Sequence, residues 1–410
     1  MIKIAICHTD FRVYWPSRLA ALEKFLEKND ASLHVIEIAG QGSPYAFAGK
    51  SNQTTSPSPW TCLFPEKRME DISSKAASAR LYETLDSLRP DVVVSGAIAY
   101  PSGATAVRWA SQRKRPVVIM DDARLKDVPR SPLVNWVKRR IYGNVDAIFI
   151  PAASHVPDYQ FWGILAKRMF LGLNVVDNAF FTERSTIARQ NAATIREKYG
   201  LPKKYFLGIG RQIPKKNWGI LIKAFCAAVR EINNDEWGLV LVGDGPEAPR
   251  LKEIAAQSGG KMIFLPFQDQ EALCQFYGLA ECLILPSSYG ETWGLVVNEA
   301  MACRLPVIVS RECGCAETLV HDGYNGWQCD PHDPVQLGQM LGRFIRLPEE
   351  ERKQMGKRSF EIIADWGLER FCGGVWQAVQ FCRKLPVHSY ASPVVDRLIL
   401  NLWHGRYRPV

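Results

Sequence analysis

Two glutamates stand eight positions apart in the segment SSYGETWGLVVNEAMACRLPVIVS, residues 287–310. Glu291 lies in a Gly-rich stretch, and Glu299 lies within an apolar pattern that predicts a helix from about Gly294 to Ala302. A helix N-terminus favours a phosphate through its unpaired N–H groups and its partial positive charge. Beside such a phosphate, a carboxylate in the turn could accept hydrogen bonds from a sugar, and one in the helix could bind both hydroxyls of a ribose. The alternative is a solvated loop residue and an ordinary helix residue at a spacing that arises by chance.

Cations that could neutralise a diphosphate occur in GIGRQIPKKNWG, residues 208–219. Arg211 follows the end of a predicted strand, and Lys216 stands just before a predicted helix that Asn217 could cap. A guanidinium binds a phosphate through two parallel hydrogen bonds, whereas a Lys ammonium acts as a mobile point charge. The pair could therefore stabilise a diphosphate leaving group without a metal. A Lys-rich surface loop is the alternative interpretation.

A further Gly-rich turn, VGDGPEAP at residues 242–249, fits the G-x-G-x-x-A spacing of dinucleotide-binding sites. In such sites the turn follows the first strand of its fold, whereas this one follows the second predicted strand of its half. Pro246 also crowds the start of the next helix. We therefore expect Gly243 and Asp244 to contact a nucleotide, and an NAD site is the less favoured alternative.

Short β-branched runs alternate with longer helical patterns along the chain, which predicts an α/β fold with parallel sheets. In the first half the expected strands are 2–7, 32–38, 91–96, 116–121 and 146–150. In the second half they are 205–210, 237–243, 261–266, 281–286 and 306–310. Open parallel sheets bind ligands at the carboxyl ends of their strands, and the three motifs above lie at such ends.

Three segments fall outside this alternation. The polar connection 175–204 is a hinge candidate between two domains. Residues 40–65 are rich in Gly, Ser and Pro and are expected to form a long loop. The tail, 385–410, carries a short amphipathic helix with basic flanks, which would either pack back across the first domain or contact a membrane surface.

The composition is typical of a soluble globular protein. The chain has 410 residues, of which 47% are hydrophobic and 23% charged, and it contains no uncharged apolar stretch of membrane-spanning length. The start, MIKIAICHTD, is interpreted as a first strand and not as a secretion signal. Eleven cysteines, several within apolar runs, are typical of reduced thiols in a cytoplasm, and their spacing predicts no zinc site.

The net charge of +9 is unevenly distributed. Residues 108–142 hold ten Lys and Arg against three Asp. Such a segment could face phosphates or the anionic headgroups of a membrane, or it could be a solvated basic face. No zinc-finger, RRM or basic coiled-coil pattern accompanies it, so we do not expect a nucleic-acid partner.

The order of the motifs resembles that of a known family. GIGRQIPKKN, VGDGP, IFLPFQ and PSSYGETWGLVVNEAMACRLPVI follow one another as in the retaining glycosyltransferases of family 4, which have the GT-B fold. VVDNAFF before the polar connection and ADWGLERF near the end are similar to that family as well. The resemblance is strong over about 170–372 and faint over 1–170.

This resemblance implies a site for a nucleotide sugar. Arg211 and Lys216 would bind the donor diphosphate. Glu291 would lie against the donor sugar and Glu299 would hold the ribose, as the two carboxylates of the family's E-x7-E motif. Further donor contacts are expected at Gly210, Gly243, Asp244, Phe267, Gln268, Thr292, Trp293, Gly294 and Leu295.

The first half departs from the family's pattern. Many relatives carry a His near the donor sugar after a strand of the first domain, where this chain has PVVIMDDARLKD. Asp121, Asp122 and Arg124 stand at that strand end, and we expect Asp122 to take the role of the His. The alternatives are a site that is arranged differently and capping of the next helix by Asp122. His8, Asp10 and Tyr14, which follow the first predicted strand, are further candidates.

The resemblance also implies the architecture of the whole chain. A GT-B protein has two Rossmann-like domains with parallel sheets that face a cleft, and a C-terminal helix that crosses back to the N-terminal domain. Residues 1–175 would form the acceptor domain, with 385–410 packed on it, and residues 176–384 would form the donor domain.

The expected function is transfer of a hexosyl group, with retention, from a UDP- or GDP-sugar to an acceptor hydroxyl, without a metal or other cofactor. The catalytic residues would be Arg211, Lys216, Glu291 and Asp122. A glycan, lipid-linked in envelope polysaccharide assembly, would be the acceptor, and the protein would be cytoplasmic or peripheral on the inner face of the membrane. The alternatives are a nucleotide-sugar epimerase and an inactive carbohydrate-binding scaffold subunit.

Overall fold

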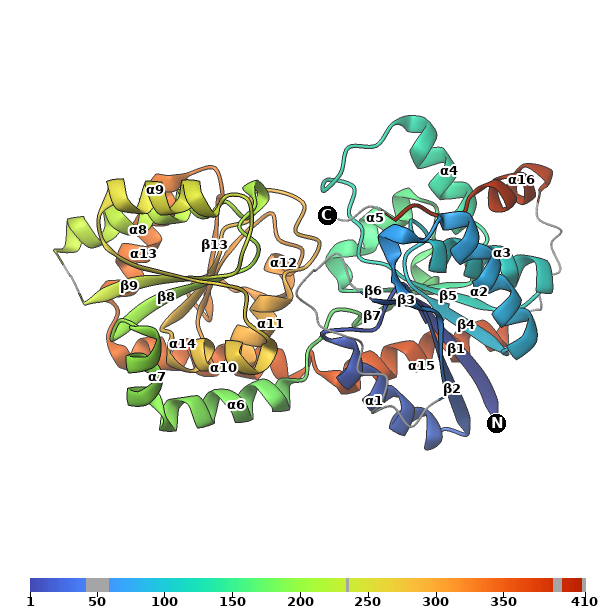
Figure 1. The fold of residues 1–410 in the computed structure, drawn as a ribbon, viewed down its shortest axis with the longest axis horizontal. Helices are drawn as coiled ribbons and strands as arrows, with labels where there is room; N and C mark the ends of the chain where they lie inside the picture. Colours follow the sequence, from blue (N-terminus) through green and yellow to red (C-terminus); the bar gives the residue numbers. More distant parts are fainter. Residues whose placement is uncertain (42–58, 234–235, 386–392, 408–410) are drawn as a thin grey trace. The chain divides into compact units, whose positions relative to one another are not determined.

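The chain folds into two compact units, one made of Met1–Val175 with Leu368–Val410 and one made of Val176–Gly367. In each unit a parallel sheet lies between layers of helices (Figure 1). The predicted α/β class with parallel sheets is therefore confirmed. The computed structural model describes residues 1–41, 59–233, 236–385 and 393–407.

The first unit is built on a sheet whose neighbouring strands all run parallel. Its described strands are β1 (Ile2–His8), β2 (Ala31–Gln41), β3 (Trp60–Arg68), β4 (Val92–Ser95), β5 (Val117–Met120), β6 (Ala147–Ile150) and β7 (Met169–Leu171). They lie in the order β3-β2-β1-β4-β5-β6-β7. The helices are α1 (Trp15–Glu27), α2 (Ser74–Leu88), α3 (Pro101–Arg113), α4 (Pro132–Tyr142), α5 (Val156–Phe161), α15 (Leu368–Lys384) and α16 (Val394–Leu402).

The inner strands β4, β5 and β6 of this sheet are buried throughout because both faces of the sheet are covered. In β1, Ala5 and Cys7 belong to one core cluster, and Ile4 and Ile6 belong to another. All four side chains have no exposed surface. Successive side chains of a strand point to opposite faces, so each face of the sheet needs its own layer of helices.

The second unit repeats this scheme. Its described strands are β8 (Lys204–Ile209), β9 (Trp237–Val242), β10 (Lys261–Leu265), β11 (Cys282–Leu285), β12 (Val307–Ser310) and β13 (Gly326–Cys329), in the parallel order β10-β9-β8-β11-β12-β13. Its helices are α6 (Asn178–Gln190), α7 (Ala192–Tyr199), α8 (Trp218–Ile232), α9 (Ala248–Ser258), α10 (Gln270–Leu279), α11 (Leu295–Ala302), α12 (Ala316–Leu319), α13 (Pro334–Arg346) and α14 (Glu349–Ala364).

Both sheets reverse their strand succession once, between β1 and β4 in the first unit and between β8 and β11 in the second. Open α/β sheets bind ligands at such a switch point, outside the carboxyl ends of the strands. The residues that follow β1, β8 and β11 are therefore the first candidates for chemistry.

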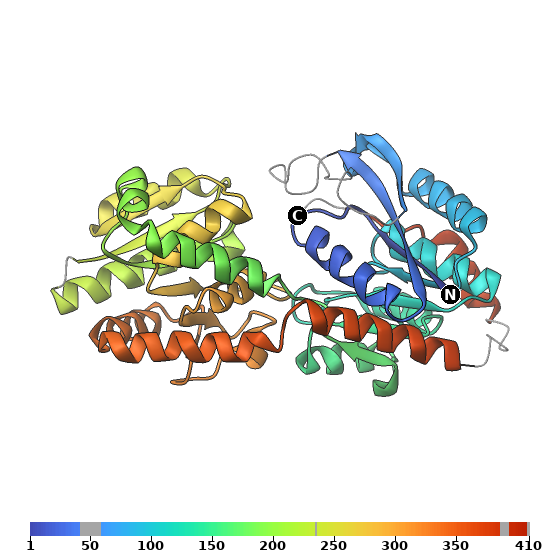
Figure 2. The ribbon, with the colours of Figure 1, turned by 90° about the horizontal axis from the view of Figure 1, so that it is seen from below.

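The last two helices of the chain belong to the first unit. The long helix α15 packs against α1, β6 and β7 (Figure 2), and α16 packs against α3 and α4. Gly374 permits the approach of α15, because a Cβ there would lie 2.5 Å from Cε2 of Phe149. The unit boundary at Leu368 differs from the expected domain boundary at residue 384, since the apolar face of α15 is buried in the core of the first sheet.

Part of the loop expected at 40–65 is a strand. β2 continues to Gln41, and β3 begins at Trp60 and pairs with β2. β3 lies at the edge of the described sheet, where Pro65 is tolerated because one side of an edge strand makes no ladder hydrogen bonds. The rest of that expectation, residues 42–58, lies outside the described residues.

The cysteines form no disulfide, since all eleven are free thiols. All of them except Cys62 are buried. Across the ranges that the structure describes, every helix is too short or too polar to cross a membrane.

Candidate functional site

Two of the predicted donor residues of the second unit, Lys216 and Glu291, meet at its switch point. Lys216 lies in the loop after β8, and Glu291 lies in the turn after β11, the neighbouring strand. Lys215 holds the two segments together, because its carbonyl accepts the backbone N–H of Ser288 at 2.8 Å and its Nζ donates to the carbonyl of Gly290 at 3.0 Å. The strand order thus brings Lys216 and Glu291, which are 75 positions apart in the sequence, into contact at the carboxyl ends of the strands.

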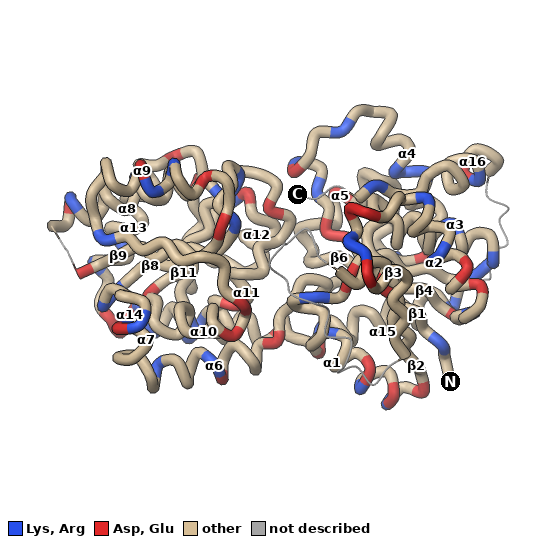
Figure 3. The backbone as a smooth tube through the Cα atoms, viewed as in Figure 1, with Lys and Arg blue, Asp and Glu red and all other residues tan. Residues whose placement is uncertain are grey.

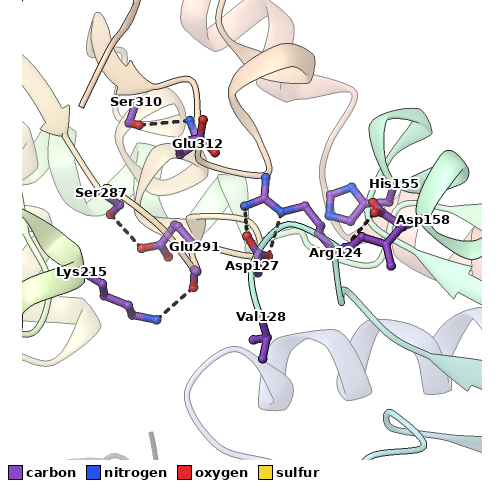
Figure 4. A network of polar contacts seen from close by, with 12 residues as sticks. Arg124, Asp127, Val128, His155, Asp158, Lys215, Ser287, Glu291, Ser310 and Glu312 are labelled. Carbon is purple, nitrogen blue, oxygen red and sulfur yellow. Dashed lines mark hydrogen bonds and ion pairs between the residues drawn. The ribbon is translucent and has the colours of Figure 1, made fainter. Parts of the chain in front are cut away.

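Lys216 and Glu291 form an ion pair within this site. Nζ of Lys216 donates to Oε2 of Glu291 at 2.5 Å. The Ser287 hydroxyl donates to the same oxygen at 3.0 Å (Figure 4). The two charged side chains are only 11% and 14% exposed. Burial alone would raise the pKa of Glu291, but Lys216 and Lys215 together with Ser287 lower it below its ordinary value. Glu291 is therefore a carboxylate that accepts hydrogen bonds.

Gly210, at the end of β8, makes room for the Lys216 side chain. Its φ is +149°, and a Cβ there would lie 3.1 Å from Cε of Lys216. Asn217 begins α8, but its side chain does not cap that helix as we expected. Instead its Nδ2 donates to the carbonyls of Pro286 and Pro331, so it ties the β8 loop to two neighbouring loops.

The turn from Glu291 to Gly294 leads into α11. Gly294 stands at the N-cap with φ +104°, and the helix begins at Leu295, which leaves its first N–H groups at the end of β11. The carbonyl of Thr292 lies against Gly314, and the Trp293 side chain is buried with its Nε1 donating to Asn298 at 2.9 Å. A donor contact from Trp293 would therefore be made by its backbone. The donor contacts of Thr292 and Trp293 stay predictions.

Glu299 lies one turn into α11 and faces the interior. It has no exposed surface, and its Oε2 accepts the hydroxyl of Tyr277, on α10, at 2.5 Å. A ribose could reach this carboxylate only if the side chains around it moved. The role of Glu299 as the ribose ligand stays a prediction.

The loops after β9 and β10 lie beside the β8 loop. Gly243 has φ +135°, and a Cβ there would lie 2.2 Å from the carbonyl oxygen of Gly210, so only glycine allows this approach. The Asp244 carboxylate accepts the backbone N–H of Phe267 at 2.8 Å. The Phe267 ring is 41% exposed, and the amide of Gln268 donates to the carbonyl of Pro266. The predicted nucleotide contacts thus share one rim of the sheet.

A comparison with family models matches this part of the chain. Residues 191–361 match the glycosyl transferases group 1. The matched range contains both loops of the Lys216–Glu291 pair and the whole of α11.

Relatives of known name align mainly over this group 1 domain. A D-inositol 3-phosphate glycosyltransferase of Thermomonospora curvata is 30% identical over 190 residues, which are 44% of this chain and 43% of the relative. An N-acetyl-alpha-D-glucosaminyl L-malate synthase of Bacillus anthracis is 27% identical over 71% of this chain and 73% of its own length. The chain thus spans about two fifths of the length of the first of these relatives.

Solved structures resemble the chain outside the group 1 domain as well. The structure of Anabaena HepE in complex with UDP and glucose superposes with a TM-score of 0.68 and 15% identity, over 93% of this chain and all of that one. A glycosyltransferase of Rickettsia africae gives a TM-score of 0.73 at 13% identity, over 94% and 99% of the two chains. With the two parallel sheets, this similarity confirms the predicted GT-B fold.

Three residues that position the pair in the group 1 domain were missed by the sequence analysis. Lys215 and Ser287 contact the turn directly, and Gly314 donates its N–H to the carbonyl of Glu291 at 2.9 Å. Ser287 could have been found, because it directly follows the predicted strand 281–286. Gly314 has no such local pattern, since its contact joins residues far apart in the sequence.

The candidates of the first unit lie after β1 and β5. The Asp122 carboxylate accepts Nδ2 of Asn174 at 3.3 Å and does not cap the next helix, whose N-cap is Ser131. The neighbouring Arg124 is buried and bonded through two nitrogens to Asp127, at 2.5 and 2.9 Å (Figure 4). The catalytic role of Asp122 stays a prediction.

His8, at the end of β1, is held neutral. Burial is the main cause that lowers the pKa of His8 to about 4, and the positive charge of Arg18 lowers it further. The hydrogen bond to the Asp10 carbonyl and the negative charge of Asp122 act in the opposite direction. The Nδ1···O distance to Asp10 is 2.9 Å, and the ring packs beside Phe11.

Because the folded state disfavours protonated His8, we expect the chain to lose stability as the pH falls from about 6.5 to 4. Over this range the unfolded chain binds the proton and the folded chain does not, so the free energy of unfolding should be about 2 kcal/mol lower at pH 5 than at pH 7 from this group alone. Urea unfolding of the native chain and of His8→Gln at both pH values measures the difference. Equal pH dependence in the two chains would contradict the assignment.

The described residues contain no group of three or more His, Cys, Asp and Glu side chains arranged to hold a metal ion.

Proposed function

We propose that the protein is a retaining glycosyltransferase of family 4 that moves a hexosyl group from a UDP- or GDP-sugar to an acceptor hydroxyl. The observation that carries this proposal is the buried Lys216–Glu291 pair at the switch point of the group 1 domain, beside the N-terminus of α11. A cation, a carboxylate and a helix N-terminus at one point suit the diphosphate and the sugar of such a donor.

The electrostatics of the site suit the departure of a diphosphate. As the bond between the anomeric carbon and the phosphate oxygen breaks, negative charge grows on that oxygen, and preorganised donors aimed at it lower the barrier. Arg211, Lys216 and the first N–H groups of α11 would supply these donors. A Lys ammonium has three N–H groups, so the bond to Glu291 leaves others for a phosphate.

Retention needs no enzymic nucleophile in this proposal. The acceptor oxygen would bond to the anomeric carbon on the face that the diphosphate leaves, and the departing phosphate oxygen would take the acceptor's proton. Glu291 would hold the sugar and orient Lys216. Asp122, in the first unit, would take the role that a His near the donor sugar has in many relatives.

Donor, cofactor and acceptor are proposed from chemistry and from the relatives. HepE was solved with UDP and glucose, which favours a UDP-hexose as the first donor to test. We propose that the reaction requires no metal or other cofactor. The proposed acceptor is a lipid-linked glycan of envelope polysaccharide assembly. The proposed location is the cytoplasm, at the inner face of the membrane.

A thermal-shift panel with UDP, GDP, ADP, CMP and NAD, each with and without EDTA, tests the donor class. A ligand that binds only the folded state stabilises it by RT ln(1 + [L]/Kd), about 2.7 kcal/mol at a hundredfold excess over Kd. For a unit of this size we expect one nucleoside diphosphate to raise the Tm by about 5 to 10 °C, with or without EDTA.

Two variants make the panel specific for the site. Arg211→Ala should lose the shift, and Arg250→Ala, which removes an exposed arginine of α9, should keep it. Stabilisation by NAD alone, or by no nucleotide, would overturn the transferase proposal. Product analysis with the labelled donor then separates transfer from epimerisation and from an inactive scaffold.

A further inference from the structure

The last helix of the chain has apolar residues on both of its sides: Leu400 and Ile399 pack against the core, and a second apolar stripe faces solvent. On α16 the side chains of Val394, Leu398 and Leu402 follow one another at four-residue spacing and are 65%, 56% and 78% exposed. The opposite side of the same helix is buried at Asp396 and Leu400. A helix on a water-exposed surface usually has polar residues on its outer side, so the outward stripe of α16 is unusual.

This orientation of α16 is fixed by polar contacts with α4. Nε of Arg140 donates to Oδ1 of Asp396 at 2.5 Å, and Nδ2 of Asn144 donates to Oδ2 of the same carboxylate at 3.2 Å. Asp396 is 7% exposed, so the anchoring carboxylate is buried between the two helices. Figure 1 shows α4 and α16 next to each other on one side of the first unit. The apolar stripe is therefore held outward.

The helix α4, which packs against α16, also carries exposed apolar side chains. Leu133 and Trp136 are 68% and 47% exposed. On the flank of α4, Nη2 of Arg139 donates to the backbone carbonyl of Phe161 at 2.6 Å. Phe161 itself is 44% exposed. Together these residues form a surface that we call the outer face; it consists of Leu133, Trp136, Phe161, Val394, Leu398 and Leu402.

Cations lie in the same segment as α4. Residues 126–140 contain five Lys and Arg, of which Arg140 is paired with Asp396, and one acidic residue, Asp127, which is paired with Arg124. The basic positions along the loop before α4 and on α4 itself are visible in Figure 3. An apolar face with Trp and Leu side chains and cations in the same segment is complementary to a bilayer with anionic headgroups.

We propose that the outer face docks the protein on the surface of an anionic phospholipid bilayer. The apolar side chains of α4 and α16 enter the boundary between headgroups and acyl chains, and the exposed cations Lys126 and Arg139 meet the lipid phosphates. The place of this docking in the reaction rests on the proposed function, because a lipid-linked acceptor would be reached there. The docking itself needs neither donor nor acceptor.

Co-sedimentation with vesicles tests the docking. The probes are phosphatidylcholine vesicles with and without phosphatidylglycerol, at about 0.1 M and about 0.5 M NaCl, which differ in Debye length. We expect binding to the anionic vesicles that weakens with salt. In the double variant Leu398→Gln/Leu402→Gln, the apparent partition coefficient should fall by about tenfold or more, because two apolar side chains no longer enter the bilayer.

A matched control and a second measurement complete the test. Val335→Gln changes an apolar residue that is 67% exposed on α13 of the second unit, and it should bind vesicles as the native chain does. An unchanged Tm of the double variant shows that it is folded. Docking is overturned if the native chain stays in the supernatant, or if the double variant still binds.

The same double variant distinguishes the bilayer from a second copy of the chain. If sedimentation equilibrium without lipid shows a dimer that the double variant abolishes, the outer face is a dimer interface and the bilayer proposal fails. Failure of docking would leave nucleotide binding in the thermal-shift panel untouched. Conversely, if no nucleotide raised the Tm, vesicle binding could still be observed. The two proposals therefore fail separately.

Discussion

Replacement of Lys216 by Met should lower kcat for donor turnover by about 10²- to 10³-fold, the loss expected when one preorganised donor to a developing anion is removed. The ammonium lies 2.5 Å from Glu291 in a site that is largely shielded from water, so its charge acts through a low local dielectric. Water cannot replace it there at full strength. The measurement is the release of nucleoside diphosphate from the labelled donor that the thermal-shift panel selects.

The Lys216 variant also needs a stability measurement. It leaves the Glu291 carboxylate buried without its cation, which is strongly destabilising for a buried ion pair. Lys216→Met/Glu291→Gln removes both charges and should regain most of the stability without regaining turnover. Lys252→Met, at an exposed position of α9 in the same unit, should behave as the native chain. Recovery of both stability and turnover in the double variant would mean that Lys216 only neutralises Glu291.

The fold could be predicted from the sequence where buried strands are continuous apolar runs. β1, β8 and β11 are of this kind, because both faces of their sheets are covered. The strands that the sequence analysis missed, β3, β7 and β13, all lie at sheet edges. An edge strand takes its structure from pairing with one neighbour, as β13 does with β12, and that pairing leaves no continuous apolar run in the sequence.

The predictable part of the candidate site consists of residues next to a strand end or a helix start. Lys216 and Glu291 are of this kind, and the switch point brings them together. The bond between Tyr277 and Glu299 could not be predicted, because it depends on how α10 packs beside α11. The same holds for α15, whose apolar face would fit either sheet.

Replacement of Gly314 by Ala is expected to destabilise the second unit by about 3 kcal/mol, in the upper range for overpacking of a filled site. A Cβ at this position would lie 1.8 Å from the carbonyl oxygen of Thr292 and 3.1 Å from Cα of Trp293. These are backbone atoms, so no side-chain rotation can relieve the overlap. The Tm of a unit of this size should fall by about 6 to 12 °C.

Gly314→Ala should weaken donor binding as well as stability, because the displaced backbone belongs to the turn that carries Glu291. The N–H of Gly314 donates to the carbonyl of Glu291, and the N–H of Cys315 donates to the carbonyl of Trp293 at 3.1 Å. A shift of this segment moves the turn away from Lys216, so the Tm increase caused by the nucleoside diphosphate should shrink more than the loss of stability alone requires.

The control is the same chemical change elsewhere in the same unit. A Cβ at Gly338, within α13, would lie 3.4 Å from the carbonyl oxygen of Ala224, which is an ordinary contact. Gly338→Ala should therefore leave nucleotide binding unchanged and raise stability by up to about 1 kcal/mol, because Ala favours the helix. If Gly314→Ala matched it in both measurements, the close packing of residue 314 against the turn would not control the site.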